Sequence, residues 1–152
     1  MKLKNIKIAT ILPYKENYTH RKASAASLWV SEFLKKSRFR NNNYIFGSTL
    51  DNDYLGKNYI NIELKNIKSK FKSTSSEYLK KLIKKIDKKN FDIIEVHNRP
   101  LILEHLIKEI KSKFIFYFHN DPLSMNGSKD LKQRLNIIKN VEKIIFVSKW
   151  VQ

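Results

Sequence analysis

The chain has 152 residues, about the length of one domain, so we expect a single compact unit over residues 1–152. It contains no cysteine, which excludes disulfides, zinc–thiolate sites and thiol nucleophiles, while a hydrophobic fraction of 41% argues against wholesale disorder. The formal net charge of +17 is spread along the chain without a recognisable nucleic-acid-binding motif, so we attribute it mainly to compositional bias.

The first part of the chain predicts two strong elements and two weaker ones. The apolar run IKIATIL (6–12) predicts a strand that is covered on both faces. The segment SAASLWVSEFLKKS (24–37) predicts a helix with one apolar stripe. That stripe consists of Leu28, Trp29, Phe33 and Leu34. NYIF (43–46) and NYINI (58–62) are weaker strand candidates.

A long helix is predicted over TSSEYLKKLIKKIDKKN (74–90), where Thr74 and Glu77 have capping-box spacing. Its apolar face consists of Tyr78, Leu79, Leu82, Ile83 and Ile86. The opposite face is a row of lysines: Lys80, Lys81, Lys84, Lys85, Lys88 and Lys89. Such a row either binds an anionic surface or is merely solvated, and the sequence leaves both interpretations open.

The second part of the chain alternates strands and helices more clearly. The predicted strands are FDIIEV (91–96), FIFYF (114–118) and KIIFVS (143–148). The predicted helices are PLILEHLIKEIKSK (100–113), which begins with Pro100, and KDLKQRLNIIKN (129–140). The latter helix has apolar residues at helical spacing: Leu131, Leu135 and Ile138. Ser148 is predicted to cap a further helix, so we expect the chain to be the front part of a longer protein.

Strands that alternate with helices of this length predict an α/β fold, a Rossmann-like doubly wound parallel sheet. In such a sheet, ligands bind in the crevice beyond the carboxyl ends of the strands. The predicted strands run into polar residues at that edge. These residues are Glu95, His97 and Asn98, then His119, Asn120 and Asp121, and finally Ser148 and Lys149. We therefore expect the binding site at this edge.

The segments HNRP (97–100) and HNDP (119–122) repeat one pattern after two different strands. Each proline restricts the preceding residue to extended geometry, so the two imidazoles are expected at neighbouring strand ends. His119 is the stronger functional candidate, whereas a loop or capping role is an equal alternative for His97. His20 is a weaker candidate in a basic loop, and His105 is interpreted as a structural residue of its helix.

Several familiar chemistries are missing from the sequence. The three glycines are isolated, so there is neither a dinucleotide-binding fingerprint nor a phosphate-binding P-loop. There is also no nucleophile-elbow serine, and no histidine spacing suggests a metal site. The chemistry at this edge is therefore expected to depend on positioning and electrostatics.

Three segments together resemble the N-terminal half of a retaining glycosyltransferase of the GT-B fold, family 4 type. They are, in this order and at these separations, FDIIEVHNRP, FYFHNDP and IIFVSKWV. The segment ILPYKENYTHRKASAASLWVSEF resembles the first strand, substrate loop and first helix of that family, so the resemblance spans nearly the whole chain. It implies an acceptor-binding N-terminal domain that faces a second domain holding a nucleotide-sugar. Transfer would retain the anomeric configuration and need no metal ion or other cofactor.

On this resemblance, His119 falls on the active-site histidine that orients the donor sugar. The substrate-binding candidates are His97, Asn98, Asn120, Asp121 and Ser148. The donor-phosphate loop falls on KASAAS, where Ser24 and Ala25 stand in a stretch that is glycine-rich in many relatives. A helix N-terminus still offers amides to a phosphate, but these side chains leave less room for close approach.

Two hypotheses of different classes remain open. The first is the acceptor-side domain of a glycosyltransferase with a nucleotide-sugar donor and a glycan or lipid-linked acceptor. It would be cytoplasmic or peripheral at the inner face of the cytoplasmic membrane. The alternative is a basic Rossmann-like binding module that docks to anionic membrane or nucleic acid without catalysis, although no specific nucleic acid is expected. The strand-end histidines favour the first hypothesis and the lysine row favours the second.

Overall fold

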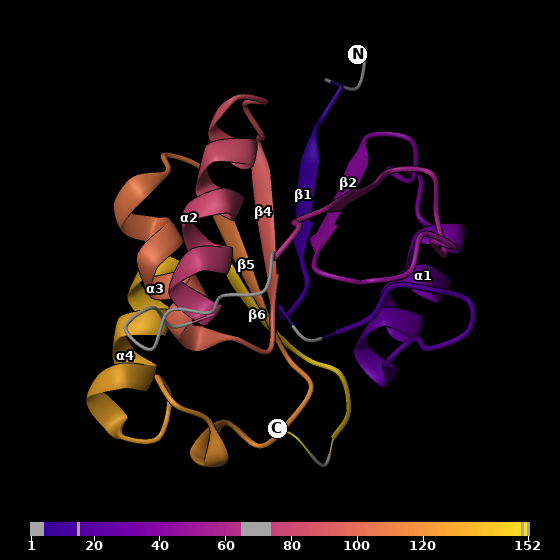
Figure 1. Cartoon of the computed structure of the whole chain (residues 1–152). Helices are drawn as coiled ribbons and strands as arrows, with labels where there is room; N and C mark the ends of the chain where they lie inside the picture. The colour runs from indigo at the N-terminus through magenta and orange to yellow at the C-terminus, as the bar shows by residue number, and fades with distance from the viewer. Residues whose placement is uncertain (1–4, 15, 65–73, 150, 152) are drawn as a thin grey trace.

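The computed structural model describes residues 5–14, 16–64, 74–149 and 151. They form one six-stranded parallel sheet with the strand order β3-β2-β1-β4-β5-β6 (Figure 1). The strands are β1 (Ile8–Ile11), β2 (Asn43–Gly47), β3 (Tyr59–Asn61), β4 (Ile93–His97), β5 (Lys113–Phe118) and β6 (Lys143–Phe146). The helices are α1 (Ala25–Lys36), α2 (Thr74–Asp87), α3 (Pro100–Glu109), the short 3-10 helix η1 (Pro122–Ser124) and α4 (Leu131–Asn140). The predicted Rossmann-like doubly wound fold is confirmed, including both weaker strands.

Helices α2, α3 and α4 cover one face of the sheet, which we call the apolar face, and α1 covers the other (Figure 1). Because side chains alternate along each strand, β1, β4 and β5 send a continuous apolar set to the first face. These buried residues are Ala9, Ile11, Ile94, Val96, Phe114, Phe116 and Phe118. They share one core with Leu82 of α2 and with Leu103 and Leu106 of α3.

The face under α1, which we call the polar face, buries hydrogen-bonding side chains between its strands. Oγ1 of Thr10 lies 2.7 Å from Oε2 of Glu95 and 2.9 Å from Oδ1 of Asn43. The Tyr117 hydroxyl donates to Oε1 of Glu95 over 3.2 Å. Burial raises the pKa of the Glu95 carboxyl, and the hydrogen bonds that it accepts from Thr10 and Tyr117 oppose this shift.

Helix α1 turns a different side to the sheet from the one that the sequence predicts. Its buried residues are Ala26, Ser27, Val30, Ser31 and Leu34. Leu28 and Phe33 are exposed and Trp29 is half-buried, so Leu34 alone of the predicted stripe is fully buried. The small side chains on the buried side fit against the sheet. The predicted stripe is wrong because helical spacing ignores the shape of the surface that the helix covers.

The apolar face of α2 agrees with the prediction, since Tyr78, Leu82 and Ile86 are buried. The stripe predicted for α4 is wrong, because Leu131, Leu135 and Ile138 are exposed and Ile137 is the buried residue. Helix α4 lies beside α3 at the β5–β6 end of the layer, so only one of its sides meets the core (Figure 1).

Helix boundaries follow local signals. Pro100 occupies the first turn of α3 as predicted, but α3 ends at Glu109 because the chain must extend again to enter β5 at Lys113. Asp130 and Gln133 form a capping box at the start of α4. The helix predicted to begin at Ser148 lies mostly outside the described residues, and the described part forms a turn in which Val151 N–H donates to the Ser148 carbonyl over 3.2 Å.

Candidate functional site

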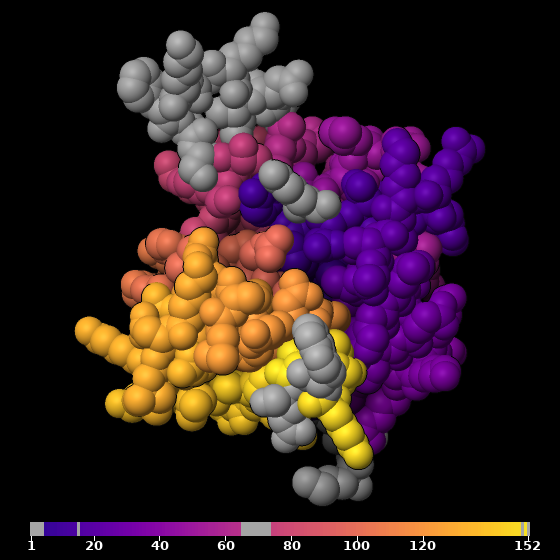
Figure 2. Space-filling view, turned by 90° about the horizontal axis from the view of Figure 1, so that it is seen from below, coloured from indigo at the N-terminus to yellow at the C-terminus, as the bar shows by residue number. Residues whose placement is uncertain are grey.

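The candidate site lies at the carboxyl edge of the sheet, which Figure 2 shows from below. His97 is the last residue of β4, and His119 follows the last residue of β5. The strand register pairs His97 with Tyr117. Because side chains two residues apart share a face, His97, Tyr117 and His119 all belong to the polar face. The sequence pattern repeated in HNRP and HNDP therefore places two imidazoles side by side.

The two histidines are hydrogen-bonded to each other. Nδ1 of His97 lies 2.8 Å from Nε2 of His119. The His97 ring stacks on Tyr117, with ring centroids 4.3 Å apart and planes 7° apart. His119 meets the Trp29 ring edge-on at 5.5 Å. Trp29 was predicted only as part of an apolar stripe, so its place at the site was missed by the sequence analysis.

Burial keeps both imidazoles neutral at pH 7. His97 is only 1% exposed, and burial together with the neighbouring His119 holds its pKa well below the ordinary value. Burial also lowers the pKa of the half-buried His119, although the nearby Glu16 carboxylate opposes this shift. The hydrogen bond between two neutral imidazoles contains one proton, which belongs to one of the two rings. The tautomer of one ring therefore fixes the tautomer of the other.

The second ring nitrogen of His97 decides between the two possible arrangements. Nε2 of His97 is buried and has no hydrogen-bond partner among the described residues. If Nδ1 of His97 donates to His119, Nε2 of His97 carries no proton and is a buried acceptor without a partner. If His119 donates instead, Nε2 of His97 carries the proton and is a buried N–H donor without a partner. Orphaned buried N–H groups are the rarer of the two, so we assign the proton of the shared bond to His97. His119 then carries its own proton on Nδ1.

Asn98 organises the loop that carries His119. Its Oδ1 accepts hydrogen bonds from the backbone N–H groups of His119 at 3.2 Å and Asn120 at 3.3 Å. Its backbone has φ of +55°, a left-handed conformation that asparagine tolerates better than most residues. Asn98 therefore supports the histidine pair through the backbone, in addition to lining a neighbouring pocket.

That pocket has a volume of about 520 Å³ and is lined by Asn98, Arg99, Asn120 and Lys129 among others. Asp121 is exposed beside it, and its Oδ1 accepts from Leu123 N–H at 2.9 Å, so this carboxylate caps η1. Ser148 lies elsewhere, in a separate groove along β6. The structure therefore brings Asn98 and Asn120 together with the histidines but does not bring Ser148 to them.

The remaining candidates make no hydrogen bond with the pair among the described residues. Ser24 is the N-cap of α1, and its Oγ accepts from Ser27 N–H at 3.2 Å, so this hydroxyl already satisfies a helix amide. Ala25 is exposed in the first turn of α1. His20 and His105 are both exposed, so neither joins the site, and the structural role predicted for His105 has no burial to support it.

A second pocket at the same edge was not predicted. It has a volume of about 640 Å³ and follows β1, β2 and β3. Its lining is Tyr14, Asn17, Ser48, Thr49, Leu50, Asn52, Tyr54, Asn61, Glu63, Leu64 and Thr74. The described lining residues include no lysine or arginine, although the chain has 31 of them. The asparagines and hydroxyl residues that follow the two weak strands were the available signal.

Hydrogen bonds fix the shape of this second pocket. Asn61 accepts from Thr49 N–H through Oδ1 at 3.0 Å and donates through Nδ2 to the Thr49 carbonyl, also at 3.0 Å. The Thr49 hydroxyl donates to Oδ1 of Asn17 at 3.1 Å. Asn17 and Thr49 come from the loops after β1 and β2, and Asn61 is the last residue of β3, so the pocket wall is held together across three adjacent strands.

No cluster of three or more histidine, aspartate or glutamate side chains that could hold a metal ion occurs within the described residues. Comparisons with protein-family models and with curated proteins find no match to this chain. The functional argument therefore rests on the geometry of the carboxyl edge.

Proposed function

We propose that the chain is the acceptor-side domain of a retaining glycosyltransferase of the GT-B type. The observation that carries the proposal is the fixed position of His119 at the end of β5. A 2.8 Å hydrogen bond from His97 holds its ring, and Oδ1 of Asn98 accepts from its backbone N–H. A half-buried neutral imidazole in this position can direct one hydrogen bond to a sugar oxygen. The resemblance of FYFHNDP to the family segment supports the same assignment.

In this proposal His119 donates from Nδ1 to an oxygen of the donor sugar, and His97 positions it. The hydrogen bond to His97 occupies Nε2 of His119, so the ring cannot change tautomer without a proton transfer from the buried partner. Stacking on Tyr117 holds the His97 ring in place. His119 is therefore preorganised as a donor before the sugar arrives, which is the property that lowers a reaction barrier.

The second pocket is the proposed acceptor region. Amide and hydroxyl side chains match the donors and acceptors of a sugar, and the rings of Tyr14 and Tyr54 can cover its apolar faces. The described lining residues include no lysine or arginine, which suits an uncharged glycan better than a polyanion. The nucleotide-sugar would be held chiefly by a second domain, with the start of α1 near its phosphates.

Sugar binding by the chain tests this proposal. We expect saturation-transfer NMR to detect neutral oligosaccharides at the second pocket, with the signal reduced in Asn61→Ala, which removes both hydrogen bonds to Thr49. An Asn126→Ala variant, in the other pocket, is the matched control. Binding of polyanions without any neutral sugar would instead support the non-catalytic binding module.

Transferase activity tests the catalytic part. A screen of nucleotide-sugars with the two-domain enzyme should give turnover that survives chelation of metal ions, because the proposed chemistry uses only side chains and backbone groups. Turnover that requires an added divalent ion would contradict this part. The 152-residue chain alone should show negligible turnover, because the donor must be held in line with the acceptor.

A further inference from the structure

Helix α4 exposes the side chains that its sequence pattern marks as a core stripe. Leu131 is 64% exposed, Leu135 is 44% exposed and Ile138 is 57% exposed. At 100° per residue these three side chains lie within about 60° of one another, and the stripe points about 130° away from the buried Ile137. An apolar stripe that faces solvent on an otherwise regular helix marks a contact surface.

Neighbouring segments extend this surface. Leu101 on α3 and Leu123 on η1 are also exposed. A groove of about 670 Å³ runs between the helices and is lined by Glu104 of α3 and by Leu131 and Leu135 of α4. Five of the exposed large apolar side chains therefore belong to α3, η1 and α4.

Basic side chains flank the stripe. Lys132 and Lys139 lie on one side of it, about 80–100° around the helix from Leu131, and both line the groove. Arg134 lies on the other side, where its guanidinium donates to the carbonyls of Ser128 at 3.0 Å and Lys129 at 2.7 Å. The helix thus has apolar residues in the centre of its exposed surface and cations at the margins.

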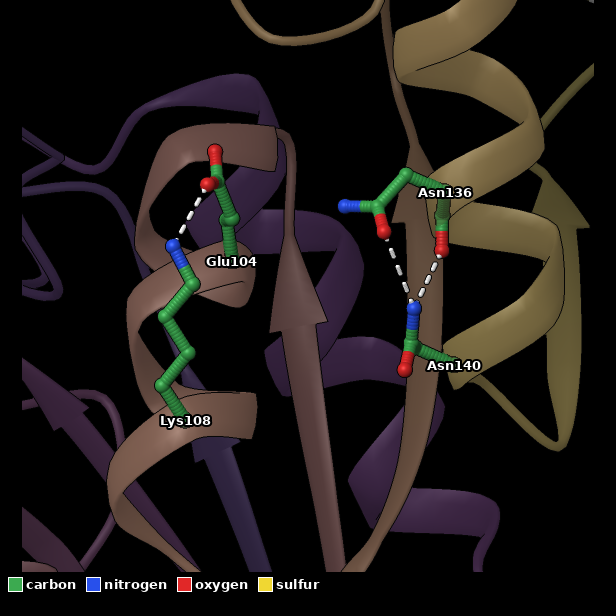
Figure 3. Close-up of polar contacts among 4 residues, drawn as sticks. All are labelled: Glu104, Lys108, Asn136 and Asn140. Atoms are coloured by element: carbon green, nitrogen blue, oxygen red, sulfur yellow. Dashed lines mark hydrogen bonds and ion pairs between the residues drawn. The ribbon is translucent and has the colours of Figure 1, made fainter.

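Two acids close to the stripe, Glu104 and Asp130, already have partners. Figure 3 shows Glu104 of α3 pointing to Lys108, and the two are 2.8 Å apart. Asp130 accepts from Gln133 N–H at 2.8 Å in the capping box of α4. Towards the end of α4, the Asn140 side chain donates to the Asn136 carbonyl at 2.7 Å (Figure 3). On α4 itself, the three cations Lys132, Arg134 and Lys139 outnumber the single N-cap carboxylate Asp130, so the surface around the stripe is net positive.

We propose that α4 docks on an anionic lipid bilayer, with Leu131, Leu135 and Ile138 inserted at the boundary between headgroups and acyl chains. An apolar stripe with lysines at its margins has the chemistry of an interfacial helix. A second copy of the chain fits less well, because a symmetric contact would bring the lysines at the margins of both copies together. No helix in the described part of the chain is both long and apolar enough to cross a bilayer.

The lysine row of α2 has the cations of an interfacial helix but not its exposed apolar stripe. None of the exposed large apolar side chains belongs to α2. Lys81 donates to the Glu63 carbonyl and Lys85 to the Asn61 carbonyl, each at 2.9 Å, so these two ammonium groups are turned towards the protein. The α2 row can attract an anionic surface but offers no side chain to insert, so docking is assigned to α4.

Docking through α4 also orients the candidate site, if the proposed function holds. The η1 segment directly follows the HND sequence at the carboxyl edge, and its exposed Leu123 lies at that edge. A bilayer that contacts α4 and η1 would lie close to the pocket beside the histidine pair, because Ser124 of η1 and Lys129 line that pocket. The acceptor class that fits this arrangement is a glycan carried on a lipid.

Vesicle co-sedimentation tests the docking surface with the chain alone. Vesicles of phosphatidylcholine, with and without about one third phosphatidylglycerol, are the probes, each at low and physiological salt. We expect binding to the anionic vesicles and at least about tenfold weaker binding by the triple variant Leu131→Gln, Leu135→Gln, Ile138→Gln. Its melting temperature should match that of the parent, because these side chains are exposed.

Two further variants complete the test. Lys132→Gln with Lys139→Gln should weaken binding to anionic vesicles, whereas Lys80→Gln with Lys84→Gln on α2 should change it by less than about twofold. Unchanged binding by the triple α4 variant would overturn the proposal, as would equal binding of the parent to neutral vesicles. A lipid-free dimer that the triple variant abolishes would show that α4 is a self-interface instead. Sugar binding is measured separately, so loss of the proposed function would leave this result standing.

Discussion

The apolar and polar faces of the same sheet differ in what their buried side chains do. On the apolar face, residues such as Phe116 pack only with other hydrocarbon groups under α2, α3 and α4. On the polar face, Thr10, Glu95 and His97 are just as buried but are tied to one another and to neighbours by hydrogen bonds. Apolar packing is therefore concentrated on one face, and the buried hydrogen-bonded ionisable groups are concentrated on the other.

The largest expected effect is loss of core packing on the apolar face. Phe116→Ala should reduce the free energy of unfolding by about 3–5 kcal/mol, because this fully buried ring leaves a cavity. Phe33→Ala on α1 is the matched control. Because Phe33 is exposed, removing its ring should reduce the free energy of unfolding by no more than about 0.5 kcal/mol. Urea unfolding followed by circular dichroism measures both. Equal losses for the two variants would show that the apolar face does not dominate stability.

The histidine at the edge of the polar face should affect turnover more than stability. If the chain belongs to the proposed two-domain transferase, His119→Ala removes the directed donor at the end of β5, and turnover should fall by about 10²-fold or more. The melting temperature should stay close to that of the parent, because His119 is only half-buried. His105→Ala, at an exposed position of α3, should change neither quantity. Normal turnover by the His119 variant, or loss of activity through unfolding, would place the active site elsewhere.

The link between the two imidazoles gives a spectroscopic prediction. His97→Phe keeps a ring stacked on Tyr117 but removes the nitrogen bonded to His119. Nitrogen-15 NMR of the histidines should show the proton of His119 on Nδ1 in the parent and on Nε2 in the variant. Turnover should fall by about tenfold, as for other positioning residues. The exposed His20 and His105 provide reference signals, and an unchanged His119 tautomer would disprove the assigned role of His97.

The smallest effect is the pH dependence caused by Glu95. Burial raises its pKa in the folded state, so the folded protein binds the proton more tightly than the unfolded chain does. Stability is therefore lost as the pH rises from the unfolded pKa through the folded pKa, and it is constant above that window. Glu95→Gln removes this loss, so the urea midpoint of the variant should depend less on pH across that window. Parallel pH profiles for parent and variant would contradict the prediction.

Much of the fold could be predicted because its signals are local. The apolar runs at β1, β4, β5 and β6 and the proline at the start of α3 depend on residues close together in the chain. The position of His119 also followed from the sequence, since parallel strands bring their carboxyl ends to one edge. The contact of His97 with His119 could not be predicted, because it depends on the register between β4 and β5 and on the rotamers of both rings.

The sequence by itself determined the alternation of strands and helices, the edge that carries the polar residues and the apolar side of α2. Only the tertiary structure decided which sides of α1 and α4 are buried, and it did so against the spacing of Leu28 and Phe33 in α1 and of Leu131 in α4. It also assembled the second pocket from residues at the carboxyl ends of three adjacent strands and from the start of α2. The physical reason is that helical spacing describes one element, whereas burial depends on the shape and polarity of whatever surface that element meets.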